Sequence, residues 1–434
     1  MESLCLVRPL ASAIYGRVLL VRHRSSGRFY ALKVMSLPHM RARRAVAGPF
    51  VQEDGDTELQ ILRKLGRNLV YSSRFNGDER ARGEGESSID GEEEAAAVRR
   101  DGDVSSWSVS PVWSNAGEDD VRATAGTQLG EQHLLTLHQD FIDRSTNTRC
   151  LLFDYCPHGD LFTHVSTRAG SDGSPNGLSL ETARACFSQI ASAVRFLHAR
   201  NVAHRDLSLE NVLLDSFRRC RVADLGLASA AGSRCSGARV GKVLYMAPEV
   251  FSRPIQRPDA AASSANTDAC VCYNGLQADV WSLGVLLFIL VTGIPPFEKA
   301  SEVDARFRLV SKPGGSVRAL LRAWGQENRL PRELRALLDW MLRVDPRQRP
   351  TAEQVCEHEW LRAANGGQQQ ARATVEDGPR WSGHGEKRPS AEPEEEEDEE
   401  NREPQKMSNL ARSWSSPRSN KRVKRMGRQC SRTV

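Results

Sequence analysis

Two carboxylates and one amide lie close together in the middle of the sequence. Asp206 and Asn211 belong to one short run, and Asp224 follows them after two apolar stretches. Carboxylate and amide oxygens are hard ligands of the kind that Mg²⁺ prefers. A carboxylate near such an ion can also orient an attacking hydroxyl and accept its proton. The pattern therefore predicts a single site that combines metal ligands with a general base.

The motifs around these residues resemble, in order and spacing, the signature of eukaryotic protein kinases. The run AHRDLSLEN at residues 203–211 is similar to the catalytic loop, DLG at 224–226 to the magnesium loop, and APE at 247–249 to the end of the activation segment. The resemblance implies transfer of the γ-phosphoryl group of ATP, with Asp206 as the base and Asn211 and Asp224 holding Mg²⁺.

A lysine upstream agrees with this resemblance. Lys33 ends the run YALK and follows Gly16 by 17 residues, the place of the ATP lysine in the family. By the resemblance, Lys33 binds the α- and β-phosphates, and a glutamate on a helix holds it in position. We expect Glu58 to be this glutamate, with Glu53 as the alternative.

The resemblance also assigns the residues around the nucleotide. They are Val18, Ala31 and Leu213 beside the adenine, Phe153 as gatekeeper, Asp154 to Cys156 as hinge, and Asp160 after the hinge. Asp160 and Glu210 are also expected to face the substrate residue three before the phosphoacceptor, which favours arginine there. The alternative is that these acids contact only ribose or solvent. In the family, the position of Ile289 selects a second arginine, two residues before the phosphoacceptor. Because isoleucine carries no charge, we expect no strict requirement for arginine at that substrate position.

The glycine-rich loop departs from the family pattern. Ala11 and Ala13 stand at its first two glycine positions, and only Gly16 is retained. Glycine lets a backbone approach a ligand closely. Since alanine is the smallest replacement, we expect weaker ATP binding rather than none.

The catalytic loop lacks its usual lysine, because Ser208 stands two residues after Asp206. The family's threonine in the activation segment is in turn replaced by Lys242. We expect the ammonium and the hydroxyl to have exchanged places across the site. In the alternative, Lys242 points to solvent and the protein is a pseudokinase scaffold that binds partners without efficient phosphoryl transfer.

Two features in the second half of the sequence complete the resemblance. Asp279 begins a run similar to the central helix of the large lobe, and Arg349 matches the arginine that pairs with the APE glutamate, here Glu249. HEW at residues 358–360 and YCPHGD at 155–160 are most similar to the calcium/calmodulin-dependent kinase group.

Activation is predicted from the arginine before the base. Arg205 could clamp a phosphorylated activation segment. The usual acceptor position is, however, occupied by Ala238, and the serines nearby are Ser229, Ser233 and Ser236. We therefore expect basal activity that does not strictly need phosphorylation of this segment.

The order of patterned segments predicts an α+β, two-lobed fold. Residues 13–35 and 134–155 have strand patterns, residues 58–65 and 180–200 have helical patterns, and residues 279–360 are helical almost throughout. The predicted kinase domain is 1–362, with disordered inserts at about 67–130 and 252–271. The tail, 363–434, carries an acidic block and then a basic block.

Composition excludes several classes of protein. Of 434 residues, 39% are hydrophobic, and the net charge of +5 argues against a protein built for nucleic-acid binding. The longest apolar run, at 280–294, is too short for a membrane span and indicates a buried helix. The ten cysteines are scattered, and no signal peptide is expected. We predict a cytoplasmic protein, with nuclear import through the basic run at 421–425 as the alternative.

The tail contains one motif that could meet the active site. Ser415 has Arg412 three residues before it and Pro417 two residues after it. This pattern fits the expected substrate preference, and it resembles the phosphoserine motif that 14-3-3 proteins bind. The expected partners are thus ATP, protein substrates with basic residues near Ser or Thr, and a 14-3-3 protein through Ser415.

Overall fold

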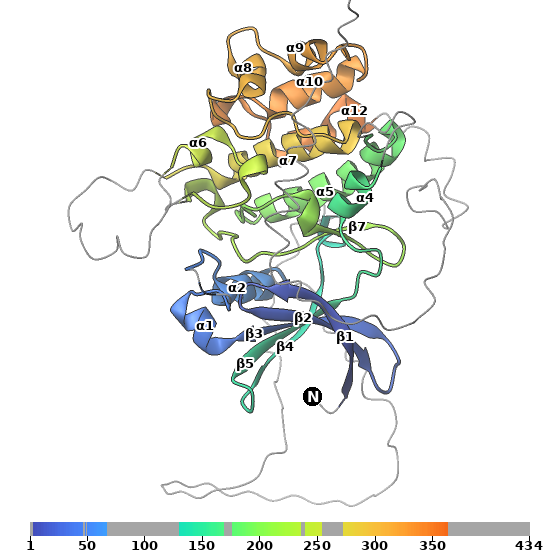
Figure 1. Cartoon of the computed structure of the whole chain (residues 1–434), viewed down its shortest axis with the longest axis vertical. Coiled ribbons are helices and arrows are strands. Elements are labelled where there is room, and N and C mark those ends of the chain that lie inside the picture. Colours follow the sequence, from blue (N-terminus) through green and yellow to red (C-terminus); the bar gives the residue numbers. More distant parts are fainter. Residues whose placement is uncertain are drawn as a thin grey trace, which may run out of the picture.

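The computed structural model describes residues 3–46, 48, 50–66, 130–168, 176–235, 239–253 and 272–362. Within them, a sheet with two helices forms a small lobe, and helices with a short two-stranded sheet form a larger one (Figure 1). This confirms the predicted two-lobed α+β fold. The tail, with Ser415, lies outside the described residues. So do Ser236, Ala238 and both predicted inserts, apart from Gly130, Ser252 and Arg253 at their edges.

The small lobe is built on an antiparallel sheet of order β1-β2-β3-β5-β4. Its strands are β1 (Leu4–Ala13), β2 (Gly16–His23), β3 (Phe29–Ser36), β4 (Leu137–Asp143) and β5 (Thr148–Asp154). The register places Val18 opposite Lys33, and Ala31 opposite Phe153. Three neighbouring strands thereby bring the expected nucleotide residues together.

The first strand lies earlier in the chain than the sequence pattern predicts. The strand prediction began at residue 13, whereas β1 ends there and contains Pro9. Proline cannot donate to a sheet, so it argues against a strand in a sequence. Here β1 is an edge strand with register shifts on either side of Arg8 and Pro9, and such an edge tolerates the proline. The prediction was wrong on this strand because its edge position was not visible in the sequence.

Two helices pack near the sheet, α1 (Leu37–Ala42) and α2 (Gly55–Gly66). The predicted helix at 58–65 is confirmed in α2. Its first turn carries Asp56 and Glu58, which interact favourably with the helix dipole. The apolar face of α2 buries Leu59, Ile61 and Leu65. This burial orients Glu58 on the same helix.

The large lobe surrounds one long buried helix. Its helices are α4 (Leu161–Ser166), α5 (Leu180–His198), α6 (Pro248–Phe251), α7 (Gly275–Thr292), α8 (Ala305–Ser311), α9 (Val317–Ala323), α10 (Arg332–Met341), α11 (Ala352–Glu357) and α12 (Glu359–Arg362). Strands β6 (Val212–Leu214) and β7 (Cys220–Val222) pair as a hairpin. Helix α7 is long and apolar enough to cross a membrane by composition, but it is buried on nearly all sides as the core of this lobe (Figure 1). The buried-helix prediction is therefore confirmed.

A buried ion pair ties the end of the activation segment to the large lobe. Both terminal nitrogens of Arg349 contact the carboxylate of Glu249 at 2.7 Å. The same guanidinium donates to the carbonyls of Gln277, Arg343 and Val344. The expected pair is confirmed, and all polar hydrogens of a fully buried arginine have nearby acceptors.

We predict that replacing Arg349 with methionine destabilises the fold by about 3–5 kcal/mol, because Glu249 is left as an unpaired, largely buried charge. Urea unfolding followed by circular dichroism measures the loss. The control is Arg347→Ala, which removes an exposed arginine paired with Asp345 two residues away. Equal stability of the two variants would contradict the role of the buried pair.

Candidate active site

Lys33 lies at the centre of a partly buried charge cluster. Its ammonium contacts both carboxylate oxygens of Glu58, at 3.0 and 2.9 Å, and Oδ1 of Asp224 at 3.5 Å. Burial alone would lower the pKa of Lys33, but the charges of Glu58 and Asp224 outweigh it and raise the pKa above its usual value. The lysine is therefore charged, and the structure places it with Glu58 rather than with Glu53.

The catalytic loop is held by one buried carboxylate. Asp279 accepts hydrogen bonds from the backbone N–H groups of His204 and Arg205, both at 2.8 Å, and from Nε2 of His198 at 2.9 Å. Arg205 has a left-handed backbone with φ of 67°. Such a conformation costs of order 1 kcal/mol in a residue other than glycine. Asp279 stabilises this strained loop from a buried position in α7.

The magnesium loop is attached to the catalytic loop by a buried histidine. His204 bonds through Nε2 to the carbonyl of Ala223 at 3.1 Å. Asp224 follows in a left-handed conformation with φ of 65°. The charge of Lys33 lowers the pKa of Asp224, although desolvation opposes this shift. Asp224 is thus an ionised carboxylate in a fixed position.

The ammonium of Lys242 lies within hydrogen-bond distance of Asp206, Ser208 and Asn211. Nζ of Lys242 is 3.0 Å from Oδ2 of Asp206, 3.0 Å from Oγ of Ser208 and 3.3 Å from Oδ1 of Asn211. Nδ2 of Asn211 also donates to Asp206 at 2.8 Å. Lys242 therefore points into the site and not toward solvent.

The approach of the activation segment to the base depends on Gly241. Its φ is +89°, and a Cβ atom there would lie 2.5 Å from the carbonyl oxygen of Arg205. Only glycine fits both the conformation and the space. The next residue, Lys242, donates its backbone N–H to Oδ1 of Asp206 at 3.0 Å. Lys242 thus contacts the base through both its main chain and its side chain.

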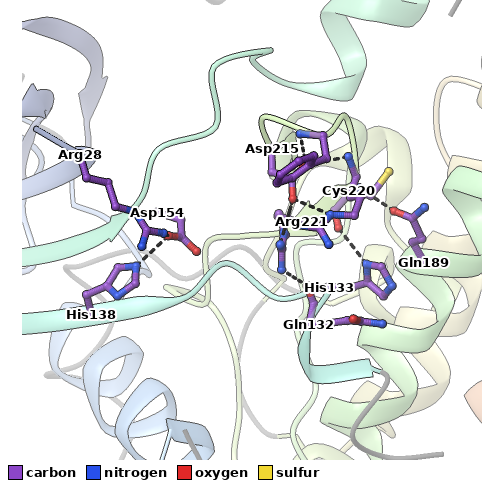
Figure 2. A network of polar contacts seen from close by, with 11 residues as sticks. Arg28, Gln132, His133, His138, Asp154, Gln189, Asp215, Cys220 and Arg221 are labelled. Carbon is purple, nitrogen blue, oxygen red and sulfur yellow. Dashed lines mark hydrogen bonds and ion pairs between the residues drawn. The ribbon is translucent and has the colours of Figure 1, made fainter. Parts of the chain in front are cut away.

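The hinge carries a polar network of its own (Figure 2). The carboxylate of Asp154 contacts His138 at 2.7 Å and Arg28 at 3.1 Å, which joins β5 to β4 and to the start of β3. Burial raises the pKa of the Cys156 thiol to about 12, assisted by the charges of Asp154 and Asp215. This cysteine is therefore a neutral thiol at physiological pH.

A second group in Figure 2 supports β7 in the large lobe. The backbone N–H of Cys220 donates to Gln189 at 2.7 Å, its carbonyl contacts His133 at 3.3 Å, and Arg221 contacts Asp215 and the carbonyl of Gln132. Burial lowers the pKa of His133 to about 4, so this ring is neutral. These contacts link residues 132–135 to the strand that leads into the magnesium loop.

The remaining predicted nucleotide residues are brought to the same side of the fold. Val18, Ala31 and Leu213 are half-buried, and Phe153 is buried in the small-lobe core. Ala11 and Ala13 pair with Val18 and Gly16 across the β1–β2 hairpin. A Cβ at Gly16 would lie 2.1 Å from the carbonyl oxygen of Val34, so this glycine is required by strand packing.

The two acids expected at the substrate differ in their surroundings. Asp160 caps α4, where its carboxylate accepts from the backbone N–H and the hydroxyl of Thr163 at 2.7 and 3.0 Å. Glu210 is partly buried beside the hydroxyl of Tyr245. Its buried Oε2 atom has no lysine or arginine partner within the described residues, so its negative charge is left for an incoming cation.

Sequence reasoning missed two contributors to the site. Glu53, which the sequence suggested only as a partner of Lys33, lies beside the magnesium loop. A Cβ atom built on Gly226 would lie 3.3 Å from Oε2 of Glu53 and 3.3 Å from Oδ1 of Asp224. The hydroxyl of Tyr15, at the tip of the β1–β2 hairpin, donates to the carbonyl of Glu53. No motif marks either contact, because both depend on how the segment before α2 folds.

The oxygen donors fit a magnesium ion. Asp224 supplies an ionised carboxylate and Asn211 an amide oxygen, and Mg²⁺ usually completes its shell with water and substrate phosphates. Across residues 3–66, 130–253 and 272–362, as far as they are described, no cluster of three His, Cys, Asp or Glu side chains could hold a metal. The ion would therefore bind together with the nucleotide, whose developing charge it would neutralise.

We predict that Glu53 makes stability depend on pH. Burial, with a contribution from Asp224, raises its pKa from 4.5 to about 7. The folded chain thus keeps this proton to a higher pH than the unfolded chain. The free energy of unfolding should then fall by at most about 3 kcal/mol as pH rises from 4.5 through 7.

Glu53→Gln should lack this fall, so it should gain stability relative to the unchanged protein at pH 8 but not at pH 5. Urea unfolding at both pH values measures the difference. Glu333→Gln, on the exposed face of α10, corrects for the loss of a surface charge. The same pH dependence with and without Glu53 would show that the carboxylate is not protonated near neutrality.

Comparison with known proteins agrees with this geometry. The sequence profile described as the protein kinase domain matches residues 126–361. NUAK family SNF1-like kinase 2 of Homo sapiens is 31% identical over 236 residues, which are 54% of this chain and 32% of that protein. CBL-interacting protein kinase 25 of Oryza sativa subsp. japonica is 32% identical over 222 residues, 49% of this chain and 37% of that protein.

The chain thus spans about a third of the length of the curated relatives it matches. The matched region begins after Lys33 and Glu58, and the structure supplies these two residues in contact with Asp224. The relatives are consistent with the resemblance to the calcium/calmodulin-dependent kinase group. With more than half of its residues matched by the family profile and both lobes present, the chain belongs to the protein kinase family.

Proposed function

We propose that the chain is a serine/threonine protein kinase that transfers the γ-phosphoryl group of MgATP to a hydroxyl of a protein substrate. The observation that carries this proposal is the pair of ammonium–carboxylate clusters, Lys33 with Glu58 and Asp224, and Lys242 with Asp206. Phosphoryl transfer needs fixed positive charge and a base more than it needs covalent chemistry. The described residues supply both, the positive charge from Lys33 and Lys242 and the base from Asp206.

Each residue has a defined task in this reaction. Lys33, held by Glu58, binds the phosphates of ATP. Asn211 and Asp224 would hold Mg²⁺, which would neutralise phosphate charge. Asp206 orients the substrate hydroxyl and accepts its proton. Since Asp206 already accepts hydrogen bonds from Asn211 and Lys242, its carboxylate has little freedom to rotate away from the substrate.

Lys242 takes over the task of the missing catalytic-loop lysine. The distances of 3.0 Å to both Asp206 and Ser208 support this exchange, because the ammonium lies between the base and the residue that occupies the usual lysine position. An ammonium fixed near a transferring phosphoryl group stabilises its charge without reorganisation. The same contacts weigh against the alternative of an inactive scaffold with Lys242 in solvent.

Substrate choice is proposed to depend on Glu210. Its buried Oε2 atom has no lysine or arginine partner within the part of the chain that is described, and a buried carboxylate without a cation is costly. An arginine three residues before the phosphoacceptor would supply both charge and hydrogen bonds. Ile289 is buried in α7, so it offers no acid for a second arginine.

The central test measures phosphate transfer from labelled MgATP to a serine peptide with arginine three residues before the acceptor. Loss of the base in Asp206→Asn should lower kcat by at least about 100-fold. A matched peptide with alanine in place of that arginine should raise KM. Equal labelling by the protein and by Asp206→Asn would reject the kinase assignment, and equal KM values would reject only the arginine preference.

A reciprocal exchange tests Lys242 directly. Lys242→Thr should lower kcat by about 100-fold, because the site loses its second ammonium. Adding Ser208→Lys to that variant restores the usual family arrangement and should return kcat to within about tenfold of the unchanged protein. Lys312→Ala, an exposed lysine on the large lobe, is the control for loss of charge. Full activity of Lys242→Thr alone would show that the ammonium has no part in transfer.

A further inference from the structure

The arginine that precedes the base is engaged by a tyrosine. The hydroxyl of Tyr273 accepts a hydrogen bond from Nε of Arg205 at 2.8 Å, and the guanidinium carbon lies 5.8 Å from the centroid of the tyrosine ring. Tyr273 is buried, with 6% of its surface exposed. The contact therefore combines a charge-assisted hydrogen bond with a cation–π contact away from bulk water.

Arg205 also connects Tyr273 with the magnesium loop. Its Nη1 atom donates to the carbonyl of Leu227 at 3.3 Å, directly after the loop that carries Asp224. One guanidinium thus joins three segments: the catalytic loop that contains it, the end of the magnesium loop, and the residue before the N-cap of α7.

The main chain of Tyr273 holds the activation segment as well. Its N–H donates to the carbonyl of Cys235 at 2.9 Å, and its carbonyl accepts from the N–H of Cys235 at 2.9 Å. Cys235 is buried, and its thiol is close to the carbonyls of Ala231 and Gly232. Tyr273 therefore holds the activation segment through its main chain and contacts Arg205 through its side chain.

From this junction we propose that Tyr273 is a positioning residue that orders the magnesium loop and the activation segment through Arg205, without a phosphate on that segment. A phosphate would attract Arg205 by charge, whereas Tyr273 engages it with a hydroxyl and a ring that are always present. Burial raises the pKa of Tyr273, so the hydroxyl stays neutral. Alanine at position 238, where the family usually has an acceptor, agrees with this arrangement.

The proposal rests on the proposed kinase activity, and its test separates the two. The full chain is treated with a protein phosphatase, and mass spectrometry verifies that no phosphate remains. Four variants are compared with it: Tyr273→Phe, Arg205→Lys, their combination, and Tyr30→Phe. The last removes a hydroxyl from a buried tyrosine of β3 and serves as the control.

We expect the phosphate-free chain to be active and Tyr273→Phe to lower its kcat about tenfold with little change in KM for ATP. Because Tyr273 acts through Arg205, the combined variant should be no worse than Arg205→Lys alone. Amide hydrogen exchange of residues 224–235 should become faster in both single variants while the thermal midpoint of the fold changes little. Tyr30→Phe should change none of these quantities.

Three results would overturn the proposal: activity that vanishes on dephosphorylation, an unchanged kcat in Tyr273→Phe, or losses that simply add in the combined variant. If Tyr273→Phe fails to fold, Arg205→Lys still tests the junction through kcat and exchange. If the chain itself shows no more transfer than Asp206→Asn, the kinase assignment fails. The exchange rates then decide alone, and unchanged protection of residues 224–235 in both single variants overturns the positioning role.

Discussion

The active site depends on one buried carboxylate, that of Asp279. It accepts two backbone hydrogen bonds from the catalytic loop and one from His198, and it is buried within α7, the core helix of the large lobe. Without these bonds, the left-handed conformation of Arg205 would be strained without compensation. Asp206 follows directly, so the position of the base is set by the large-lobe core. The ion pair of Arg349 with Glu249 fixes the far end of the activation segment to the same core, because Arg349 also donates to the carbonyl of Gln277 in α7.

The sequence predicted which residues form the site better than it predicted the contacts between them. Lys33, Asp206, Asn211 and Asp224 occur in motifs with fixed spacing, and the structure brings all four together. Helices α2 and α5 followed from helical patterns, because each buries one face against a core, and α7 followed from its long apolar run, because it is buried on nearly all sides. Strand β1 was misplaced because local rules disfavour Pro9, and only its place at the sheet edge makes that residue acceptable.

The contacts that could not be predicted join segments far apart in the chain. Asp154 with His138, Tyr15 with the carbonyl of Glu53, and Arg205 with Tyr273 are each made by side chains with no characteristic spacing. Their partners depend on the relative placement of loops, which hydrophobic patterning does not specify. For Lys242 the two residue types at 208 and 242 were suggestive, but the direction of the side chain became clear only from its three contacts in the site.

Placing the second ammonium on the activation segment has a physical consequence for regulation. A lysine in the catalytic loop would be held by the core whether or not the activation segment is ordered. Lys242 instead reaches Asp206 only while Gly241 lies against the carbonyl of Arg205. The activation segment therefore becomes ordered in the same equilibrium that brings the ammonium of Lys242 to Asp206. Any contact that stabilises the ordered segment also completes the active site. A chain with this arrangement needs a permanent anchor for the segment. The junction of Arg205, Leu227, Tyr273 and Cys235 supplies such an anchor, and its Tyr273 and Cys235 are buried.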